Sequence, residues 1–274
     1  IGRILIILNM KSIILSYSDV GGAGRAAVNI CKSLQKSQIK TELYVKRKIS
    51  NSNFIKSFYK KSLFDFENFK EKINRNFCKL GKKKTYSYQS PSLFPTKVSK
   101  ILNTSDFDIV HLCWINEFLS IEDIGKIKKP VIWSFCDMWP FSGINHYDEY
   151  NGEIFWRKNN FEKLIKFSLD KWIIRRKIKS WKLPMNIVVP NKWMYDCVKD
   201  SKIMSDFNCE IIKWPIDDSI FYSKNKIDFK MKFNFDPKKK LVLFACSNGL
   251  KDRRKGWDYL NSSLNMVKQK FDLV

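Results

Sequence analysis

The sequence predicts an α/β protein with a parallel, doubly wound sheet. Short apolar runs typical of strands alternate with stretches of helical periodicity, which favours parallel strands joined by helices. The first apolar run leads into a glycine-rich turn, Gly21-Gly22-Ala23-Gly24, and then into a helix. Glycines let the backbone approach a ligand closely, and a helix N-terminus offers free N–H groups to a phosphate. We therefore expect the chain to handle a nucleotide or a phosphorylated sugar.

The elements are expected in a regular order along the chain. Strands are expected at Ser12–Tyr17, Thr41–Val45, Ile109–Trp114, Val131–Phe135, Asn186–Val189, Glu210–Lys213 and Leu241–Ala245. Helices are expected at residues 24–36, 58–78, 118–127, 161–182 and 191–199.

Local signals justify several of these elements. In the first helix, Ala27, Ile30 and Leu34 recur at helical spacing. Pro130 precedes the fourth strand, where its missing N–H costs no ladder hydrogen bond. Asn191 is a residue type that caps helix N-termini, so we expect the last helix to begin beside it.

The composition allows one large domain or two modest ones. The chain has 274 residues, and 44% of them are hydrophobic, which is enough for a sizeable core. There are 51 lysines and arginines against 27 aspartates and glutamates, which gives a net charge of +24. This charge attracts phosphates, nucleic acid or anionic membranes, or else forms a solvated surface with no dedicated partner. No apolar run is long enough for a transmembrane helix.

Two segments combine basic and aromatic residues. Residues 56–100 interleave lysine with phenylalanine and tyrosine. Residues 161–182 have the pattern of a cationic amphipathic helix, with Phe161, Ser168 and Trp172 at helical spacing. This helix is either an ordinary packed helix with a solvated basic face or an element for peripheral contact with an anionic membrane.

Cysteine and histidine usage argues against a disulfide framework and against a metal centre. The seven cysteines are dispersed, odd in number, and form no C-x-x-C pair, which favours a reducing cytoplasmic location. Only His111 and His146 are present, so a histidine-rich metal site is excluded.

Candidate binding residues follow two of the expected strands. Asp137 and His146 come after the strand that begins at Val131, and ligands of open α/β sheets bind at such carboxyl ends. Each side chain is suited to bind a substrate hydroxyl. The alternative is a structural role, in which Asp137 is a turn carboxylate and His146 makes its hydrogen bonds within the protein. Arg254 and Lys255 follow the last expected strand and suit a diphosphate, although a basic surface turn is the alternative.

The glycine turn also matches the dinucleotide-binding pattern, as Gly22-x-Gly24-x-x-Ala27. An NAD site needs an acidic residue at the end of the second strand, and here that strand ends in Lys46-Arg47. Those cations suit an NADP phosphate, so an NADP-dependent oxidoreductase domain is one alternative function. A basic module that binds nucleic acid or a membrane surface is another, although no nucleic-acid-binding motif appears.

Taken together and in order, six blocks resemble glycosyltransferase family 4, and most closely its bacterial surface-polysaccharide (colanic-acid-type) branch. These retaining nucleotide-sugar enzymes have the GT-B fold. The blocks cover most of residues 12–260, and six in order are far more specific than a glycine motif alone. They are SDVGGAGRAA (18–27), DIVHLCWIN (108–116), CDMWPFSGINHY (136–147), IVVPNKWMYDCV (187–198), IIKWPIDDSIF (211–221) and LVLFACSNGLKDRRKGWDYL (241–260).

The resemblance implies two facing Rossmann-like domains with the reaction between them. Residues 10–216 would form a complete acceptor-binding domain, 217–239 a linker, and 240–274 the start of a nucleotide-sugar-binding domain. The enzyme would move a hexose from a nucleotide diphosphate sugar to a glycan or lipid-linked acceptor, with no metal or other cofactor and no nucleic-acid partner. It would be cytoplasmic, with peripheral contact at the inner face of the cytoplasmic membrane.

The resemblance also assigns binding residues, and it leaves the catalytic residues unknown. The donor phosphates would be bound by Gly21, Gly22, Gly24, Arg254 and Lys255. The acceptor or sugar would be bound by Asp137, Trp139 and His146.

Three departures from the family pattern bear on activity. Cys136 stands where the family has histidine, and Trp214 stands where it has asparagine. The family's Glu-x7-Glu element is missing, and we expect it beyond Val274, in a chain truncated within its second domain. Such a fragment is expected to be inactive alone. Residues 1–9 precede a natural start at Met10 and are expected to be read-through from upstream.

Overall fold

The structure, a computed structural model, describes residues 10–60, 63–79, 88–147, 156–158, 168–182, 184–246 and 252–268. The chain divides into two compact units, Ile1–Asp217 and Asp218–Val274. The first unit contains the sheet. That the second unit begins a nucleotide-sugar-binding domain stays a prediction.

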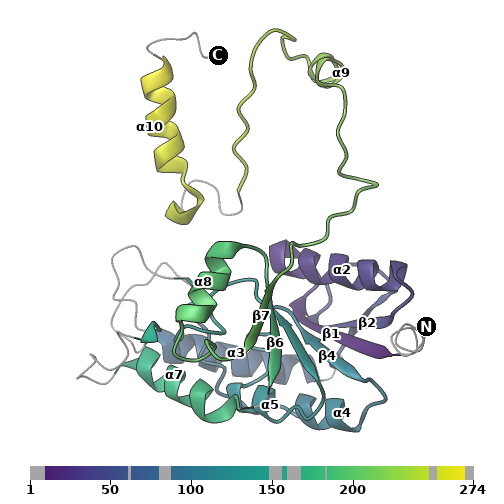
Figure 1. Ribbon diagram of the computed structural model, residues 1–274, viewed down its shortest axis with the longest axis vertical. Coiled ribbons are helices and arrows are strands. Elements are labelled where there is room, and N and C mark those ends of the chain that lie inside the picture. The colour runs from purple at the N-terminus through teal and green to yellow at the C-terminus, as the bar shows by residue number, and fades with distance from the viewer. Residues whose placement is uncertain are drawn as a thin grey trace. The chain divides into compact units, whose positions relative to one another are not determined.

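The first unit is built on an open sheet of seven strands, every pair of them parallel (Figure 1). Its order is β3-β2-β1-β4-β5-β6-β7, so the chain reverses its direction of travel across the sheet between β1 and β4. This Rossmann-like arrangement confirms the predicted α/β class. The strands are β1 Lys11–Ser18, β2 Lys40–Arg47, β3 Ile55–Ser57, β4 Ile109–Leu112, β5 Val131–Ser134, β6 Met185–Val189 and β7 Asn208–Ile211.

Helices cover both faces of this sheet. They are α2 Gly21–Lys36, α3 Phe64–Lys79, α4 Val98–Thr104, α5 Ile121–Gly125, α7 Leu169–Ser180 and α8 Lys192–Asp200. Figure 1 shows α2 over one face and α4, α5 and α7 over the other. Successive side chains of β1 alternate between the two faces of the sheet. Ile14 packs in the hydrophobic cluster beneath α2, while Ile13 and Leu15 pack in the larger core on the opposite face.

Several boundaries differ from the expected ones for reasons that lie in the sheet. Residues 55–57 form β3 because they pair with Leu43–Val45 of β2, so the following helix begins at Phe64 and not at residue 58. The last strand begins at Asn208, two residues early, because Cys209 is buried opposite Ile187. Helix α4 was not expected. The expected helix 161–182 is described only from residue 168, where Ser168 caps α7.

The second unit contains α9 Lys226–Lys232, the short 3-10 helix η3 Arg253–Lys255 and α10 Trp257–Lys268. The prediction of a strand at Leu241–Ala245 is wrong, because these residues have no regular structure and Leu243 is 89% exposed. A strand exists only when its N–H and C=O groups meet a neighbouring strand. The described part of this unit contains no other strand that could pair with it.

Within the part of the chain that the structure describes, no helix is both long enough and apolar enough to cross a bilayer.

Candidate functional site

The candidate site lies at the carboxyl ends of β1, β4 and β5, beside the point where the strand order reverses. Ligands of open α/β sheets bind at such a point. The ends of β1 and β4 are joined by a hydrogen bond from Tyr17 N to Trp114 O (2.6 Å), and the two rings pack edge to face. The Trp114 indole N–H in turn donates to Asp137 Oδ2 (2.5 Å). These contacts bring the glycine turn and the segment after β5 to one edge.

The glycine turn connects β1 to α2. Gly21 has a φ of +76°, in the left-handed region that favours glycine, and begins the helix. A Cβ on Gly24 would lie 2.7 Å from Ser18 O and from Asp19 C, so only glycine allows this close packing of α2 on the turn. By contrast, Gly22 is exposed and has open space around it.

The N-terminus of α2 faces outward without a side-chain cap. Val20 precedes the helix and makes no capping hydrogen bond, and the first turn contains no acidic residue. The nearby carboxylate of Asp19 instead accepts hydrogen bonds from Ile49 N and Ser50 N, each 2.8 Å long. Burial alone would raise the pKa of Asp19, but these bonds outweigh it and lower the pKa. The first-turn N–H groups of α2 are therefore suited to an external anion.

Asp137 and His146 form a buried pair after β5. His146 Nδ1 lies 2.6 Å from Asp137 Oδ2, and His146 Nε2 lies 2.9 Å from Ser90 Oγ. Both Asp137 and His146 are almost fully covered by protein. The pair therefore fixes the segment 137–146 against its neighbours, and direct contact between these two side chains and a sugar stays a prediction.

Trp139 is placed differently from the expectation. Its side chain is fully buried and its ring packs at steep angles against those of Trp133 and Trp181. Its indole N–H donates to Ser90 O (2.7 Å). A ring in this position packs in the core and has no surface to offer a sugar in this structure. We therefore leave Trp139 out of the candidate site.

Helix α7 holds the segment 139–144 through two charged side chains. Lys177 is completely buried, and its ammonium donates to the carbonyls of Trp139, Ser142 (3.0 Å) and Gly143 (2.9 Å). Burial lowers the pKa of Lys177 well below its ordinary value. Two turns earlier, Asp170 Oδ1 accepts a hydrogen bond from Ile144 N (2.8 Å).

Sequence reasoning missed Lys177, although a signal was present. Lys177 occurs at helical spacing from Ile173, Ile174 and Trp181, all of which are buried. A lysine on the apolar face of an amphipathic helix needs acceptors in the interior, which marks it for a structural role.

A second charged cluster lies at the ends of β1 and β2. Lys46 Nζ lies 3.0 Å from Glu71 and 3.4 Å from Glu67, and Arg47 lies 2.9 Å from Glu71. The Tyr17 hydroxyl also donates to Glu71 (3.1 Å). The two cations that would suit an NADP phosphate are therefore already neutralised by carboxylates of α3, so the structure does not favour the oxidoreductase alternative.

Glu117 lies beside this cluster and was also not foreseen. It has a φ of +59° and lines a cavity of about 10 Å³ together with Lys46, Glu71, Asn74 and Ser92. Burial raises the pKa of the Glu117 carboxyl to about 7, although a hydrogen bond from Asn74 and the charge of Lys46 oppose the rise. Asn74 donates to Oε2 of this carboxyl, whereas Oε1 has no hydrogen-bond partner among the described residues.

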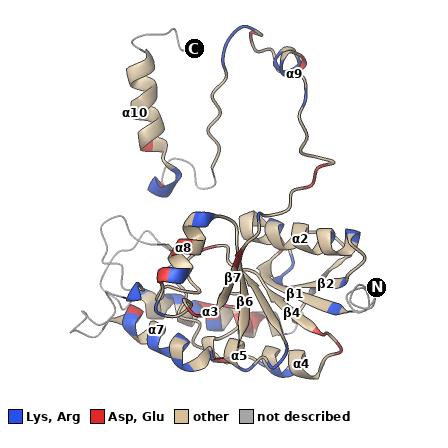
Figure 2. Ribbon diagram, in the orientation of Figure 1, with Lys and Arg blue, Asp and Glu red and all other residues tan. Residues whose placement is uncertain are grey.

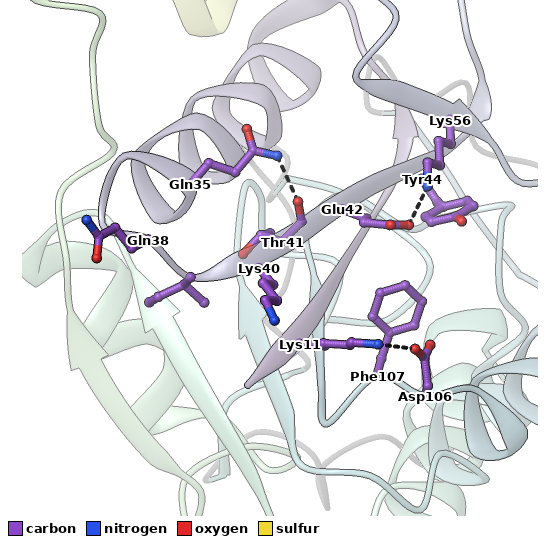
Figure 3. A pocket seen from close by; sticks show the side chains of 11 residues that line it. Lys11, Gln35, Gln38, Lys40, Thr41, Glu42, Tyr44, Lys56, Asp106 and Phe107 are labelled. Carbon is purple, nitrogen blue, oxygen red and sulfur yellow. Dashed lines mark hydrogen bonds and ion pairs between the residues drawn. The ribbon is translucent and has the colours of Figure 1, made fainter. Parts of the chain in front are cut away.

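A larger hollow of about 680 Å³ lies at the opposite, amino edge of the sheet (Figure 3). Two lysines that line it are paired with carboxylates: Lys11 with Asp106, and Lys56 with Glu42 (2.7 Å). Tyr44 also lines it. Because this hollow is at the wrong end of the strands for a Rossmann-like ligand and its paired cations are already neutralised, we do not assign the site to it.

The two residues that depart from the family pattern are at least partly buried. Burial raises the pKa of the Cys136 thiol well above its ordinary value. Trp214 packs against the cluster beneath α2 that includes Ile14 and Ala27.

The basic residues predicted to bind a diphosphate belong to the second unit. Arg254 and Lys255 lie in η3, just before α10 (Figure 2). The Arg254 guanidinium is paired with Asp252 at 2.6 Å. This pairing lowers the pKa of Asp252. Since they belong to Asp218–Val274, these residues are not part of the geometry described for the first unit.

Among the described residues, no group of three or more His, Cys, Asp or Glu side chains is placed to hold a metal ion. The chain matches no protein-family profile, and no curated protein matches it significantly. The likeness to family 4 glycosyltransferases therefore depends on the six sequence blocks.

Proposed function

We propose that the chain belongs to a retaining GT-B glycosyltransferase of family 4, which transfers a hexose from a nucleotide diphosphate sugar to a glycan or lipid-linked acceptor. The reaction would serve bacterial surface-polysaccharide synthesis. The observation that carries this proposal is the uncapped N-terminus of α2, where Gly21 and Gly22 are exposed beside the strand-order reversal. The six ordered blocks of sequence supply the link to this family.

In this proposal the glycine turn lies next to the donor phosphates and the transferred sugar. The leaving diphosphate gains negative charge as the glycosidic bond to it breaks, and the N–H groups of Gly22 and its neighbours stabilise that charge. Arg254 and Lys255 would add positive charge from the second unit. Asp137 and His146 would set the shape of the acceptor side through the segment that they hold.

The sharpest test changes charge at Gly22. A Cβ there meets no atom within 4 Å, so the side chain of Gly22→Asp fits without a clash. An aspartate in the first turn stabilises the helix by its interaction with the dipole, yet it repels a phosphate at the same place. Any loss of binding would therefore come from charge and not from unfolding.

The measurement is calorimetric titration of the full chain with UDP-, GDP- and ADP-hexoses. We expect Gly22→Asp to weaken binding of the preferred nucleotide sugar by about tenfold or more, a change of about 1.4 kcal/mol. Gly22→Asn, which has the same size and no charge, is the matched control and should lose much less. Equal affinities for the aspartate variant and the wild-type chain would contradict the proposal.

A further inference from the structure

Helix α3 is attached to the sheet through its polar face. Glu67, Glu71 and Asn74 recur at helical spacing and are all buried. They contact Lys46, Arg47 and Tyr17 at the ends of the strands, and Asn74 donates to the Glu117 carboxyl. A surface helix of a globular protein ordinarily buries an apolar stripe, whereas α3 buries this polar row against the sheet.

The apolar stripe of α3 is left outside. Phe66 and Phe69 are each 58% exposed and Ile73 is 37% exposed, and their spacing of three and four residues places them along one line on the helix. Because ion pairs and hydrogen bonds already hold α3 to the sheet, burial of this stripe is not what fixes the helix. Two exposed phenylalanines in one stripe point to a further surface that covers them.

Positive charge surrounds the stripe. Lys72, Arg75 and Lys79 are exposed on α3, and Lys70 Nζ lies 4.6 Å from the centre of the Phe66 ring. Asp65 is the one exposed carboxylate of α3, since both of its glutamates are buried against cations of the sheet. The outward surface of α3 is therefore apolar along its stripe and basic beside it.

The neighbouring helix α7 adds to this charge. Phe77 of α3 packs against Trp172 of α7, with ring centroids 6.1 Å apart. Arg175 and Lys179 are exposed on α7, and Figure 2 shows basic residues along that helix. The apolar residues Ile173 and Ile174 of α7 are buried, so α7 contributes charge, while α3 contributes the exposed apolar stripe.

We propose that α3 is an interfacial helix that docks the protein on an anionic lipid surface. Phe66, Phe69 and Ile73 would lie among the acyl chains at the level of the headgroups, and the flanking lysines and arginines would contact lipid phosphates. A symmetric contact between two copies would place like charges against each other, which disfavours self-association. The inference uses the surface of α3 alone and does not depend on the proposed sugar transfer.

The test is co-sedimentation of the full chain with lipid vesicles. One set of vesicles is pure phosphatidylcholine, and the other contains equal parts of phosphatidylcholine and phosphatidylglycerol. We expect binding to the anionic vesicles, weaker binding as salt is raised, and little binding to the neutral ones. Strong binding to neutral vesicles, or no binding to anionic ones, would overturn the proposal.

Two variants separate the apolar stripe from the charge. Phe66→Ser combined with Phe69→Ser and Ile73→Ser should reduce the partition onto anionic vesicles by about tenfold or more. Lys72→Glu combined with Arg75→Glu should reduce it similarly and remove most of its salt dependence. The matched control is Ile101→Ser with Trp193→Ser, which removes exposed apolar side chains from α4 and α8 and should leave vesicle binding unchanged.

The remaining outcomes are also decisive. All of the substituted side chains are at least one-third exposed or carry surface charge, so circular dichroism should show the wild-type thermal transition in each variant. Unchanged vesicle binding by the triple serine variant would refute the role of α3. Concentration-dependent dimers that this variant abolishes, or binding of a single-stranded oligonucleotide in place of vesicles, would assign the surface to a different partner and overturn the proposal.

Discussion

Glu117 combines an unusual backbone conformation with an unusual carboxyl pKa. Its φ is positive, its carboxyl is buried beside Lys46 and Glu71, and its pKa is raised to about 7 from an ordinary value of 4.5. Between these two pKa values the folded chain binds more protons at this site than the unfolded chain. The contribution of Glu117 to stability therefore falls as the pH rises through this window.

A neutral isostere should remove this pH dependence. We expect Glu117→Gln to match the wild-type chain near pH 5 and to exceed its unfolding free energy near pH 8, by up to roughly 3 kcal/mol. The measurement is urea unfolding followed by tryptophan fluorescence at both pH values. His111, whose pKa burial lowers to about 4, is common to both proteins and cancels in the comparison. A variant that is destabilised equally at both pH values would contradict the assignment.

Two glycines of the turn should respond in opposite ways to the same substitution. Gly24→Ala places a Cβ 2.7 Å from backbone atoms of Ser18 and Asp19, and we expect it to cost about 1–3 kcal/mol. Gly22→Ala meets open space within a helix and should be neutral or stabilising by up to about 1 kcal/mol. Urea unfolding of the two variants measures both effects, and equal losses would show that the packing of α2 on the turn differs from that described.

Among the secondary-structure elements, α7 acts as a clamp on the segment that follows β5. Its apolar residues pack in the core, while Asp170 and Lys177 bond backbone groups of residues 139–144. Helix α3 has a different design, because its two glutamates face the sheet and its apolar stripe faces outward. Amphipathic periodicity by itself does not say which face a helix buries.

The clamp predicts a large effect from one lysine. Lys177→Met keeps the apolar stem but leaves up to three buried carbonyl groups without their donor, and we expect a loss of about 3 kcal/mol in unfolding free energy. Lys179→Met, an exposed lysine of the same helix, is the control and should change stability by less than about 0.5 kcal/mol. Thermal or urea unfolding gives both values, and similar losses for the two variants would rule out the clamp.

At the scale of the whole molecule, the two units are packed very differently. All of the buried hydrophobic residues among those described lie in the first unit. The described residues 218–246 are mostly exposed, and they include several lysines. Local stability follows buried apolar contacts, so the two units should open with different free energies.

Limited proteolysis should separate them. Under native conditions we expect trypsin to cut first within residues 218–240 and to leave a resistant fragment that contains the sheet. Mass spectrometry of the time course identifies the first cleavage sites. Early cuts within the sheet, at rates similar to those in the second unit, would contradict this picture.

The sequence alone predicted the α/β class, the parallel sheet and the glycine turn that follows its first strand. These features depend on short stretches of sequence, because apolar runs, helical spacing, a capping Asn191 and glycines can each be recognised within a few residues. It also placed Asp137 and His146 after the same strand, because the carboxyl end of a strand is a position along the chain. Six of the seven strands were anticipated within two or three residues of their ends.

The contacts of individual side chains became visible only in the folded chain. Trp139 is in the core, and Lys46 and Arg47 are paired with carboxylates of α3. Lys177 is buried and donates hydrogen bonds to three backbone carbonyls. The apolar run at Leu241–Ala245 is not a strand. Each of these outcomes depends on partners far away along the chain or, for the strand, on a neighbour that the described unit lacks. Burial and charge compensation are properties of contacts between elements, and no periodicity within one element specifies them.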